Sequence, residues 1–431
     1  IIETIDRHRE EILEFARDIY SHAELGYKEF QTSGKFVKKM EQLGLRTEKG
    51  FAITGVKAYL NEDKKENASL ALLGELDALC IPEHAFANPE TNAAHCCGHH
   101  AQMAGVFGAA LALTVPEIAE KLDGQVVFFA TPAEEYGEIE FKNQLREQGK
   151  IRYGGGKCEL LRIGAFDDID LCLTHHIRPG NEILVGSGTG NGFVSKVIRV
   201  LGKASHAAGA PEKGVNALSA ASLGLQALGL NRETFRDEDC VRVHPIITKG
   251  GNLVNVIPDE VVVETLVRGK TIEAFTDAAK KTDRSFKAGA IAMGAKVEIS
   301  TLRGYLPTLA EEALPELKHA AEISASGIPV IEASGHAGGS TDVGDVQHLM
   351  PVYTFNTGGV KGGLHQIDFE VTDEEEAYIV TAKMFALAAY GLLQEKAQRS
   401  RELVDQYEPV FKNSAEYVEF MEQFDSKEIF E

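Results

Sequence analysis

The sequence predicts an α/β protein in which one domain is inserted into another. The chain has 431 residues, more than a single hydrophobic core usually supports, so two domains are expected. Short apolar runs of strand character alternate with helical stretches along most of the chain, which favours an α/β fold with a mixed central sheet. Between residues 191 and 303 a different order of elements interrupts this alternation, and the first pattern resumes afterwards.

Three apolar runs are expected to form buried strands of the central sheet. They are SLALLGEL (69–76), the run that opens QVVFFATPAEE (125–135), and LCLTHH (171–176). Helices are expected at the start of the chain, near 31–44, and over the Ala- and Leu-rich stretch 99–115. Each of the three runs passes into polar residues at its carboxyl end, and in open α/β sheets ligands bind at that edge.

The interrupting segment has its own pattern of elements. We expect a strand at 193–202, a helix at 213–230, strands near 241–249 and 260–268, a helix at 273–294 and a strand at 295–302. This β-α-β-β-α-β order is typical of a ferredoxin-like module. Helix 309–326, the strand VYTFN and a long helix near 372–395 then complete the first domain. The predicted domains are therefore 1–190 with 304–431, and the inserted 191–303.

The acidic tail beyond residue 396, which includes YVEFMEQF, is expected to form a peripheral surface helix.

Composition excludes several classes of partner. The chain has 44 Lys and Arg and 65 Asp and Glu, which gives a formal net charge of −21. Nucleic acids and anionic membranes are bound by clustered Lys and Arg. No apolar run approaches the roughly 20 residues of a membrane span. Six scattered cysteines without a spaced framework favour a reduced, cytoplasmic setting. We therefore expect neither a nucleic-acid nor a membrane partner.

Residues 95–100 read HCCGHH and raise the question of metal binding. The cluster is either a metal site or a chance group of core residues, because a lone Cys or His is usually packed in the core. Cys97 and His99 sit at the predicted start of a helix. There the helix dipole is expected to lower the pKa of the thiol and favour the thiolate that binds metals.

Three further segments bring potential ligands to the same sheet edge. In PAEE, Glu134 and Glu135 follow a strand, where adjacent side chains point to opposite faces, so one could bind a cation while the other acts as a base. His175 and His176 end another strand, and His365 lies in a Gly-rich loop. Each alone could be a solvated loop residue. Together they form the ligand set expected of zinc or manganese, with a carboxylate to activate water.

Eight motifs occur in an order that resembles the aminoacylase/carboxypeptidase-G family of dinuclear metallopeptidases. They are ELDAL (75–79), HCCGHH, PAEE, HHIRP, GKASHAA (202–208), GGNLVNVIPDEV (250–261), GGSTDVGD (338–345) and GLHQ. The chain is more similar to the amidohydrolase branch, whose signature resembles H-A-C-G-H-D and whose P-E-L-G segment resembles SHAELGYKE (21–29). The segments GELDAL and STDVGD are more similar to the aminobenzoyl-glutamate hydrolase group within this branch. The resemblance spans about residues 15–385 and leaves out the extra C-terminal helix.

The resemblance implies a site for two divalent metal ions per subunit, zinc or manganese. Cys97 would bridge the ions, and the shells would be completed by His99, Glu135, His176 and His365.

Other residues take supporting roles by the same resemblance. Glu134 would be the general base, and Asp77 would support the ligands from the second sphere. Two positions depart from the branch: His100 stands where Asp or Asn is usual, and Cys96 replaces a small residue and could compete as a ligand. His95 and His175 are interpreted as second-sphere or structural residues.

The inserted module resembles the lid and dimerisation domain of the family, which implies a homodimer. His206 would reach into the partner subunit's site and donate a hydrogen bond to the developing oxyanion. Asn255 and Arg268 match the Asn and Arg that hold polar groups of the substrate, and Arg suits a carboxylate through forked hydrogen bonds.

These expectations describe a metal-dependent amidohydrolase. Its substrate would be a small N-acyl amino acid, an aminobenzoyl-glutamate-like conjugate or a dipeptide. One alternative is the same chemistry on a ureido compound or another small amide. The other is a non-catalytic metal-binding protein, which the presence of Glu134 beside a full ligand set disfavours.

Overall fold

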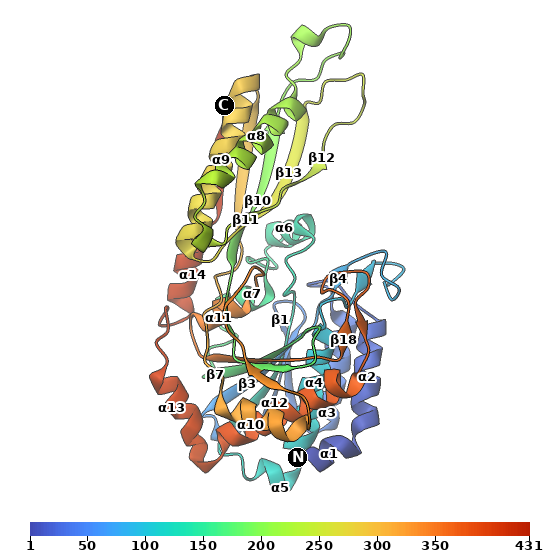
Figure 1. The fold of residues 1–431 in the computed structure, drawn as a ribbon, viewed down its shortest axis with the longest axis vertical. Coiled ribbons are helices and arrows are strands. Elements are labelled where there is room, and N and C mark those ends of the chain that lie inside the picture. Colours follow the sequence, from blue (N-terminus) through green and yellow to red (C-terminus); the bar gives the residue numbers. More distant parts are fainter. The chain divides into compact units, whose positions relative to one another are not determined.

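A computed structural model describes residues 1–431. The chain divides into two compact units, which are described separately (Figure 1). Unit 1 contains residues 1–188, 309–335 and 345–415, and unit 2 contains residues 189–308, 336–344 and 416–431. The segment 191–303, predicted as an inserted domain, lies within unit 2, where two short segments from later in the chain join it.

Unit 1 is built on a mixed eight-stranded sheet. Its strands in spatial order are β1 (Arg46–Phe51), β2 (Gly55–Leu60), β6 (Gln125–Thr131), β3 (Ser69–Glu75), β7 (Leu171–Ile177), β17 (Val352–Thr357), β8 (Ile183–Val185) and β15 (Val330–Glu332). The four central strands, β6, β3, β7 and β17, are parallel neighbours, whereas β1, β2 and β8 pair antiparallel. The α/β fold with a mixed central sheet is therefore confirmed.

The three predicted strands are the ones that carry the polar residues to one edge. Every residue of β3 and β6 is buried, as expected of strands covered on both faces. Because β6, β3 and β7 run parallel, their carboxyl ends lie at the same edge of the sheet. Residues 75–77, 131–135 and 175–177 are thereby brought together.

Ten α-helices lie wholly within unit 1. They are α1 (Ile2–Arg7), α2 (Arg9–Ser21), α3 (Phe30–Gln42), α4 (His99–Leu113), α5 (Pro116–Ala119), α6 (Ile139–Glu147), α7 (Gly156–Arg162), α10 (Pro315–Ser324), α12 (Thr381–Leu393) and α13 (Gln398–Gln406). All fifteen residues of α4 are buried, because it packs between α2, α12 and β3. This explains its Ala- and Leu-rich sequence without a polar face. Short helices α11 (Val343–Gln347) and α14 (Ser414–Glu422) cross the boundaries between the units.

One helical stretch, Glu375–Leu393, is long and apolar enough to cross a membrane by length and composition. It consists of a π-helical segment, Glu375–Val380, followed by α12. Burial within the protein covers 78% of its most apolar window, which identifies it as a core helix.

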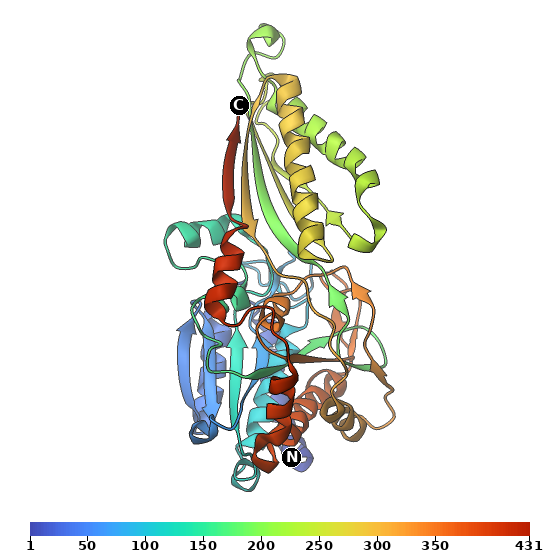
Figure 2. The ribbon, with the colours of Figure 1, turned by 90° about the vertical axis from the view of Figure 1, so that its left-hand side faces the viewer.

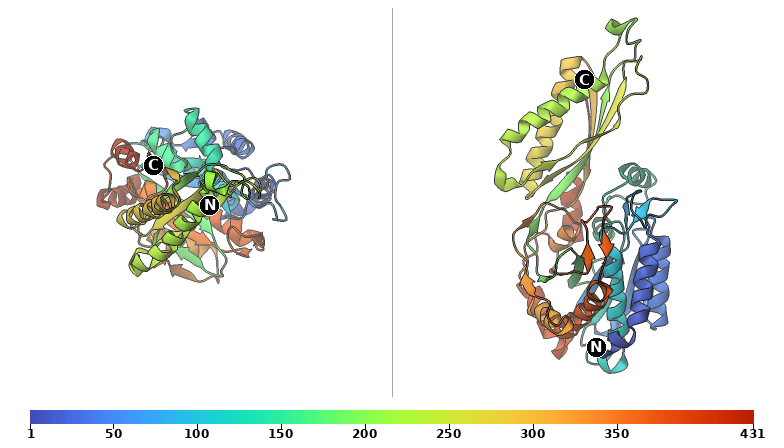
Figure 3. Two further views of the ribbon diagram at one scale, coloured as in Figure 1. Left: turned by 90° about the horizontal axis from the view of Figure 1, so that it is seen from above. Right: turned by 45° about the vertical axis from the view of Figure 1, so that its right-hand side comes forward.

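Unit 2 is an antiparallel sheet covered on one face by two helices (Figure 3). Its strands are β11 (Arg242–Val243), β13 (Glu260–Gly269), β10 (Gly192–Leu201), β14 (Lys296–Arg303) and β20 (Ser426–Phe430), and β12 (Ile246–Lys249) pairs with β13. Burial alternates strictly along β13, so that Val261, Val263 and Val267 pack into one core with α8 (Ala217–Asn231) and α9 (Ile272–Met293). The main elements follow the predicted β-α-β-β-α-β order, as β10, α8, β12, β13, α9 and β14.

Three two-stranded sheets complete the structure. They pair β4 (Leu79–Cys80) with β5 (Ala93–Ala94), β9 (Thr189–Gly190) with β16 (His336–Ala337), and β18 (Val360–Lys361) with β19 (Glu370–Val371).

The C-terminal tail differs from the expected peripheral helix. Tyr417 and Met421 of α14 are buried, and the last residues form β20, which the sequence analysis missed. β20 pairs antiparallel with β14, with Phe430 opposite Val297, and the red C-terminal strand is seen at the edge of the sheet in Figure 2. A five-residue strand is too short to be recognised by alternation alone, because its stability depends on the edge to which it pairs.

Candidate metal centre

The turn that carries Glu134 and Glu135 is held by Asp77. Ala133, the residue before them, has a left-handed backbone conformation with φ of 48°, which is costly for a residue with a side chain. The Asp77 carboxylate accepts hydrogen bonds from the backbone N–H of Glu134 (3.0 Å) and of Glu135 (2.9 Å). The buried Glu29 accepts a third, from Ala133 N (2.8 Å). These three hydrogen bonds hold the strained turn in place and fix the backbone positions from which the two glutamate side chains extend.

The two glutamate side chains approach different partners. Oε1 of Glu135 lies 3.1 Å from His365 Nε2, and Oε2 of Glu134 lies 3.9 Å from His99 Nε2. The divergence was expected from the alternation of side chains in a strand, but both residues lie beyond Thr131, where β6 ends. The turn held by Asp77 separates them instead.

Gly98 allows Cys97 and His99 to stand on either side of a tight bend before α4. Its φ is 89°, and a Cβ at this position would lie 2.0 Å from a side-chain carbon of Ile177. Both the left-handed backbone and the close approach therefore require glycine. The Cys97 Sγ faces two imidazoles, 3.4 Å from His176 Nε2 and 3.2 Å from His365 Nε2.

Hydrogen bonds orient the histidine rings towards the same centre. Nδ1 of His99 lies 2.8 Å from the backbone oxygen of Asp77, and Nδ1 of His176 lies 2.8 Å from the backbone oxygen of Ile177. A carbonyl only accepts, so in each neutral ring the proton is on Nδ1 and the Nε2 lone pair is available as a ligand. The loop of His365 is fixed by its backbone N–H, which donates to the Cys96 oxygen at 2.9 Å.

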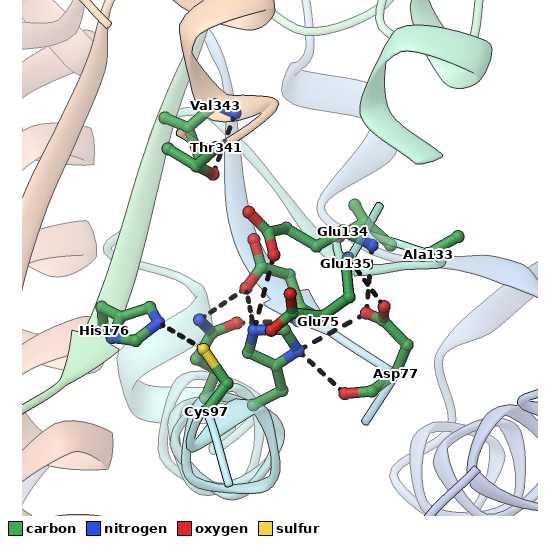
Figure 4. A network of polar contacts seen from close by, with 12 residues as sticks. Glu75, Asp77, Cys97, Ala133, Glu134, Glu135, His176, Thr341 and Val343 are labelled. Atoms are coloured by element: carbon green, nitrogen blue, oxygen red, sulfur yellow. Dashed lines mark hydrogen bonds and ion pairs between the residues drawn. The ribbon is translucent and has the colours of Figure 1, made fainter. Parts of the chain in front are cut away.

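Three groups of donor atoms, each within 4.8 Å of one another, share these residues. Figure 4 shows Glu75, Cys97, Glu134, Glu135 and His176 of these groups directed towards one another. The first is Cys97, His99 and His176, the second is Cys97, Glu135 and His365, and the third is Glu75, His99 and Glu134. All five predicted ligand residues are thus brought together, and Cys97 belongs to both of the first two groups. Their roles as ligands remain a prediction.

Two buried atoms of the cluster suit a cation as partner. His99 Nε2 and Glu135 Oε1 are buried and make no hydrogen bond. Imidazole nitrogen, thiolate sulfur and carboxylate oxygen are the donors that zinc and related divalent ions use. The residues therefore fit the divalent metal ions that the sequence implied.

The pKa of Cys97 differs from the expectation based on the helix dipole. Burial, together with the nearby Glu135 carboxylate, raises the pKa of the Cys97 thiol well above its usual value. Desolvation outweighs the dipole because the thiolate would be removed from water among acidic groups. Thiolate formation here needs a cation beside it, which a bound divalent ion would supply.

Three residues that the sequence analysis left unassigned belong to this cluster. Glu75 lies 3.1 Å from His99 Nε2, and it accepts hydrogen bonds from Lys157 Nζ (2.5 Å) and Gln102 Nε2 (2.8 Å). Burial would raise the pKa of Glu75, but Lys157 and His99 together lower it to about 2. Only the position of Glu75 at a strand end, two residues before Asp77, could have indicated it; the stretch GGGKCELL contains no pattern that indicates Lys157.

The other Cys and His residues of the motifs lie in the core. His175 points to the opposite side of β7 from His176, where its Nε2 lies 2.8 Å from Thr357 Oγ1. The rings of His95 and His100 lie 5.3 Å apart in the interior, tilted by 52° to each other. Cys96 is part of the hydrophobic core of unit 1 and belongs to none of the donor groups.

The three remaining predicted residues lie in unit 2. His206 is in the loop after β10, where its Nδ1 accepts a hydrogen bond from Gly209 N (2.9 Å), so a neutral ring carries its proton on Nε2. Asn255 is close to it, because its backbone oxygen accepts from Ala207 N at 2.9 Å. Arg268 lies opposite Phe193, at the other end of β10, with its guanidinium over the Phe193 ring.

Comparison with known proteins connects this arrangement to a family. The family described as Peptidase family M20/M25/M40 matches residues 71–390, so α13, α14 and β20 lie beyond the match. The chain is 27% identical to the Xaa-Arg dipeptidase of Mus musculus over 412 residues, covering 92% of this chain and 85% of that protein. It is also 27% identical to a p-aminobenzoyl-glutamate hydrolase subunit of Escherichia coli over 308 residues, 70% of this chain and 58% of that protein.

The fold is also shared with solved structures. One is the YXEP protein of Bacillus subtilis, described as a dinuclear metal binding peptidase, with a TM-score of 0.63 and 24% identity. The alignment covers 90% of this chain and 99% of that protein.

Proposed function

The chain belongs to Peptidase family M20/M25/M40 and is a metal-dependent amidohydrolase or peptidase of that family, and we propose that it cleaves the amide bond of a small N-acyl amino acid, an aminobenzoyl-glutamate-like conjugate or a dipeptide. One observation carries this proposal: the donors of Cys97, His99, Glu135, His176 and His365, from four separate segments, meet at one edge of the sheet of unit 1, with Glu134 beside them. A protein that only stored metal would have no need of the additional carboxylate of Glu134.

The site is proposed to hold two divalent ions, zinc or manganese, that share the Cys97 thiolate. When bound, such ions polarise a carbonyl oxygen and lower the pKa of a water molecule. The two donor groups that share Cys97 support this stoichiometry. Zinc is favoured by the thiolate, and the carboxylates also suit manganese.

Glu134 is proposed to be the general base. It is 8% exposed, and its backbone N–H is hydrogen-bonded to Asp77. Its carboxylate is therefore held beside the donor cluster by a fixed backbone. It would take a proton from the attacking water and return it to the leaving amine. Asp77 would act as a positioning residue, since its carboxylate bonds the amides of both glutamates.

His206 is proposed to donate a hydrogen bond to the oxyanion that develops from the amide carbonyl. Its Nδ1 accepts a hydrogen bond from the backbone, so a neutral imidazole carries its proton on Nε2. His206 is exposed, so this N–H can donate to a substrate. Asn255 is proposed to bind a polar group of the substrate beside it.

Arg268 is proposed to bind a carboxylate of the substrate, but it lies far from His206 within unit 2. In the β10–β13 ladder Phe193 faces Arg268 and Leu201 faces Glu260, and His206 follows Leu201. Eight residues of antiparallel strand span about 27 Å, more than the length of a dipeptide. If both residues hold one substrate, they must therefore come from different subunits, which supports a shared site in a homodimer.

The outer edge of β12 is the surface we propose for this homodimer. β20 covers the edge of β14, whereas β12 pairs only with β13. The side chains of Ile246 and Ile247 on β12 are 61% and 43% exposed, on a strand whose backbone can accept another strand.

Metal analysis followed by a panel of amide substrates tests the proposal. We expect about two divalent ions per chain after reconstitution, hydrolysis of N-acyl amino acids or dipeptides, and loss of activity on chelation. Fewer than one bound ion, or no hydrolysis by the fully loaded protein, would refute it.

Six cysteines without a disulfide support the proposed cytoplasmic location.

A further inference from the structure

We propose that Glu75 is an additional ligand of the ion held by His99 and His176, and that the buried Lys157 is the counter-cation that holds it in place. The inference rests on the proposed metal site and goes beyond the ligand set that the sequence implied. It concerns the ion-binding chemistry of the site and not the identity of the substrate.

The two oxygen atoms of Glu75 face different environments. Oε1 accepts from Lys157 Nζ at 2.5 Å, on the side away from the imidazoles. Oε2 lies 3.1 Å from His99 Nε2, the ring nitrogen whose lone pair is directed to the site, and it also accepts from Gln102 Nε2. Both donors bind divalent ions at about 2.0–2.2 Å, so atoms 3.1 Å apart can contact the same ion. A ligand carboxylate that is hydrogen-bonded on its outer oxygen is a common arrangement in metal sites.

Stability alone does not explain this ion pair. Lys157 and Glu75 are 0% and 3% exposed. Removing two charges from water often costs more than their pairing recovers, and apolar residues of similar size are often as stabilising. An acidic side chain in such a place, with one oxygen on Lys157 and the other 3.1 Å from His99 Nε2, is better explained by a second cation that both His99 and Glu75 contact.

The charges of the cluster support this reading. Glu75 and Lys157 together add a donor oxygen without adding net charge. The other acidic groups of the cluster are Asp77, Cys97, Glu134 and Glu135. With Cys97 as a thiolate, these four groups match the charge of two divalent ions.

The two donor groups become alike when Glu75 is included. The group with His365 contains one carboxylate, Glu135, whereas the group of Cys97, His99 and His176 contains none. Glu75 gives the second ion its own carboxylate. Its loss should therefore weaken one of the two ions and leave the other nearly unchanged.

Titration of the metal-free protein with Zn²⁺ against a chromogenic chelator tests this directly. Glu75→Gln, which keeps the shape but loses the charge, should weaken one of two bound Zn²⁺ ions by at least about 10²-fold, since loss of a supporting residue alone costs about 10–100-fold. Lys157→Gln should weaken the same ion by about 10–100-fold, and Lys157→Arg should recover part of this loss.

A matched control is the pair of Glu159 and Arg162, which is also buried at its carboxylate, with 2.5 Å between Glu159 Oε1 and Arg162 Nη2. Glu159→Gln removes a buried paired carboxylate outside the donor groups and should leave both Zn²⁺ affinities unchanged. Wild-type affinities in folded Glu75→Gln would overturn the assignment of Glu75, and an unchanged Lys157→Gln would overturn the role of Lys157.

A crystal structure of the zinc-loaded wild-type protein decides the question even if the variants do not fold. A Glu75 oxygen at about 2.0–2.2 Å from the ion supports the proposal, and one beyond about 3 Å overturns it. If the wild type binds fewer than one ion, the proposed function itself fails. If it binds two and hydrolyses amides while Glu75 contacts neither, only this inference fails.

Discussion

Asp77→Asn is the substitution that most directly tests how the site is held together. The Asp77 carboxylate is fully buried and accepts from two backbone amides, those of Glu134 at 3.0 Å and Glu135 at 2.9 Å. An asparagine has one acceptor oxygen, so its NH₂ group must face one of the two N–H donors. One buried amide then loses its partner, at a cost of about 1–3 kcal/mol, and the other loses the assistance of the negative charge, about 1 kcal/mol more. We expect the free energy of unfolding to fall by about 2–4 kcal/mol.

Urea unfolding in the presence of chelator measures this loss separately from metal binding. Asp170→Asn provides the control, because the exposed Asp170 accepts one backbone hydrogen bond, from Ser69 N at 2.7 Å, which an amide oxygen can also accept. Its effect should stay within about 0.5–1 kcal/mol. In the loaded protein, Asp77→Asn should also lower metal affinity by about 10–100-fold, as loss of an outer partner does. An unchanged unfolding midpoint together with unchanged metal affinity would show that Asp77 does not hold the turn.

Three further predictions concern catalysis, assembly and pH. Glu134→Gln should lower turnover by at least about 10²-fold with metal content near wild type, and persistent activity would mean that another group activates the water. Mixing inactive Glu134→Gln and His206→Ala subunits should restore up to about half of wild-type activity per mixed dimer, as expected for one complete site in two; no recovery despite verified exchange would exclude a shared site. Burial, reinforced by Asp77, raises the pKa of Glu29 to about 7 from 4.5, so its contribution to stability is complete below pH 4.5 and is lost as the pH rises through 7. The free energy of unfolding of the metal-free protein should therefore fall by about 2–3 kcal/mol relative to Glu29→Gln between pH 5 and pH 8, and parallel pH profiles would contradict the shift.

The family and the clustering of the candidate ligands could be predicted because they depend on local patterns. Apolar runs that end in polar residues identify strands β3, β6 and β7, and parallel strands align their carboxyl ends whatever surrounds them. HCCGHH contains two of the predicted ligands, Cys97 and His99, only two positions apart, so their proximity does not depend on distant contacts. The predicted family is confirmed by the match over residues 71–390.

The tail shows where local pattern was insufficient. β20 exists because the edge of β14 is available to pair with it, and nothing within SKEIF encodes that edge. The buried faces of Tyr417 and Met421 likewise depend on neighbours from other parts of the chain. A surface helix was therefore a reasonable prediction from the sequence and was incomplete.

The order of residues along the chain was enough to identify which side chains could bind metal ions and that they follow strand ends, begin a helix or lie in a Gly-rich loop. The electrostatic state of these side chains and the groups that support them depend on the folded chain. Lys157 meets Glu75 across 82 positions, and Asp77 meets the amides of Glu134 and Glu135 across 57 and 58. The pKa of Cys97 is raised although the start of a helix favours a thiolate, because desolvation and Glu135 act more strongly than the helix dipole. Burial and long-range pairing are properties of the folded neighbourhood, so no stretch of sequence contains them.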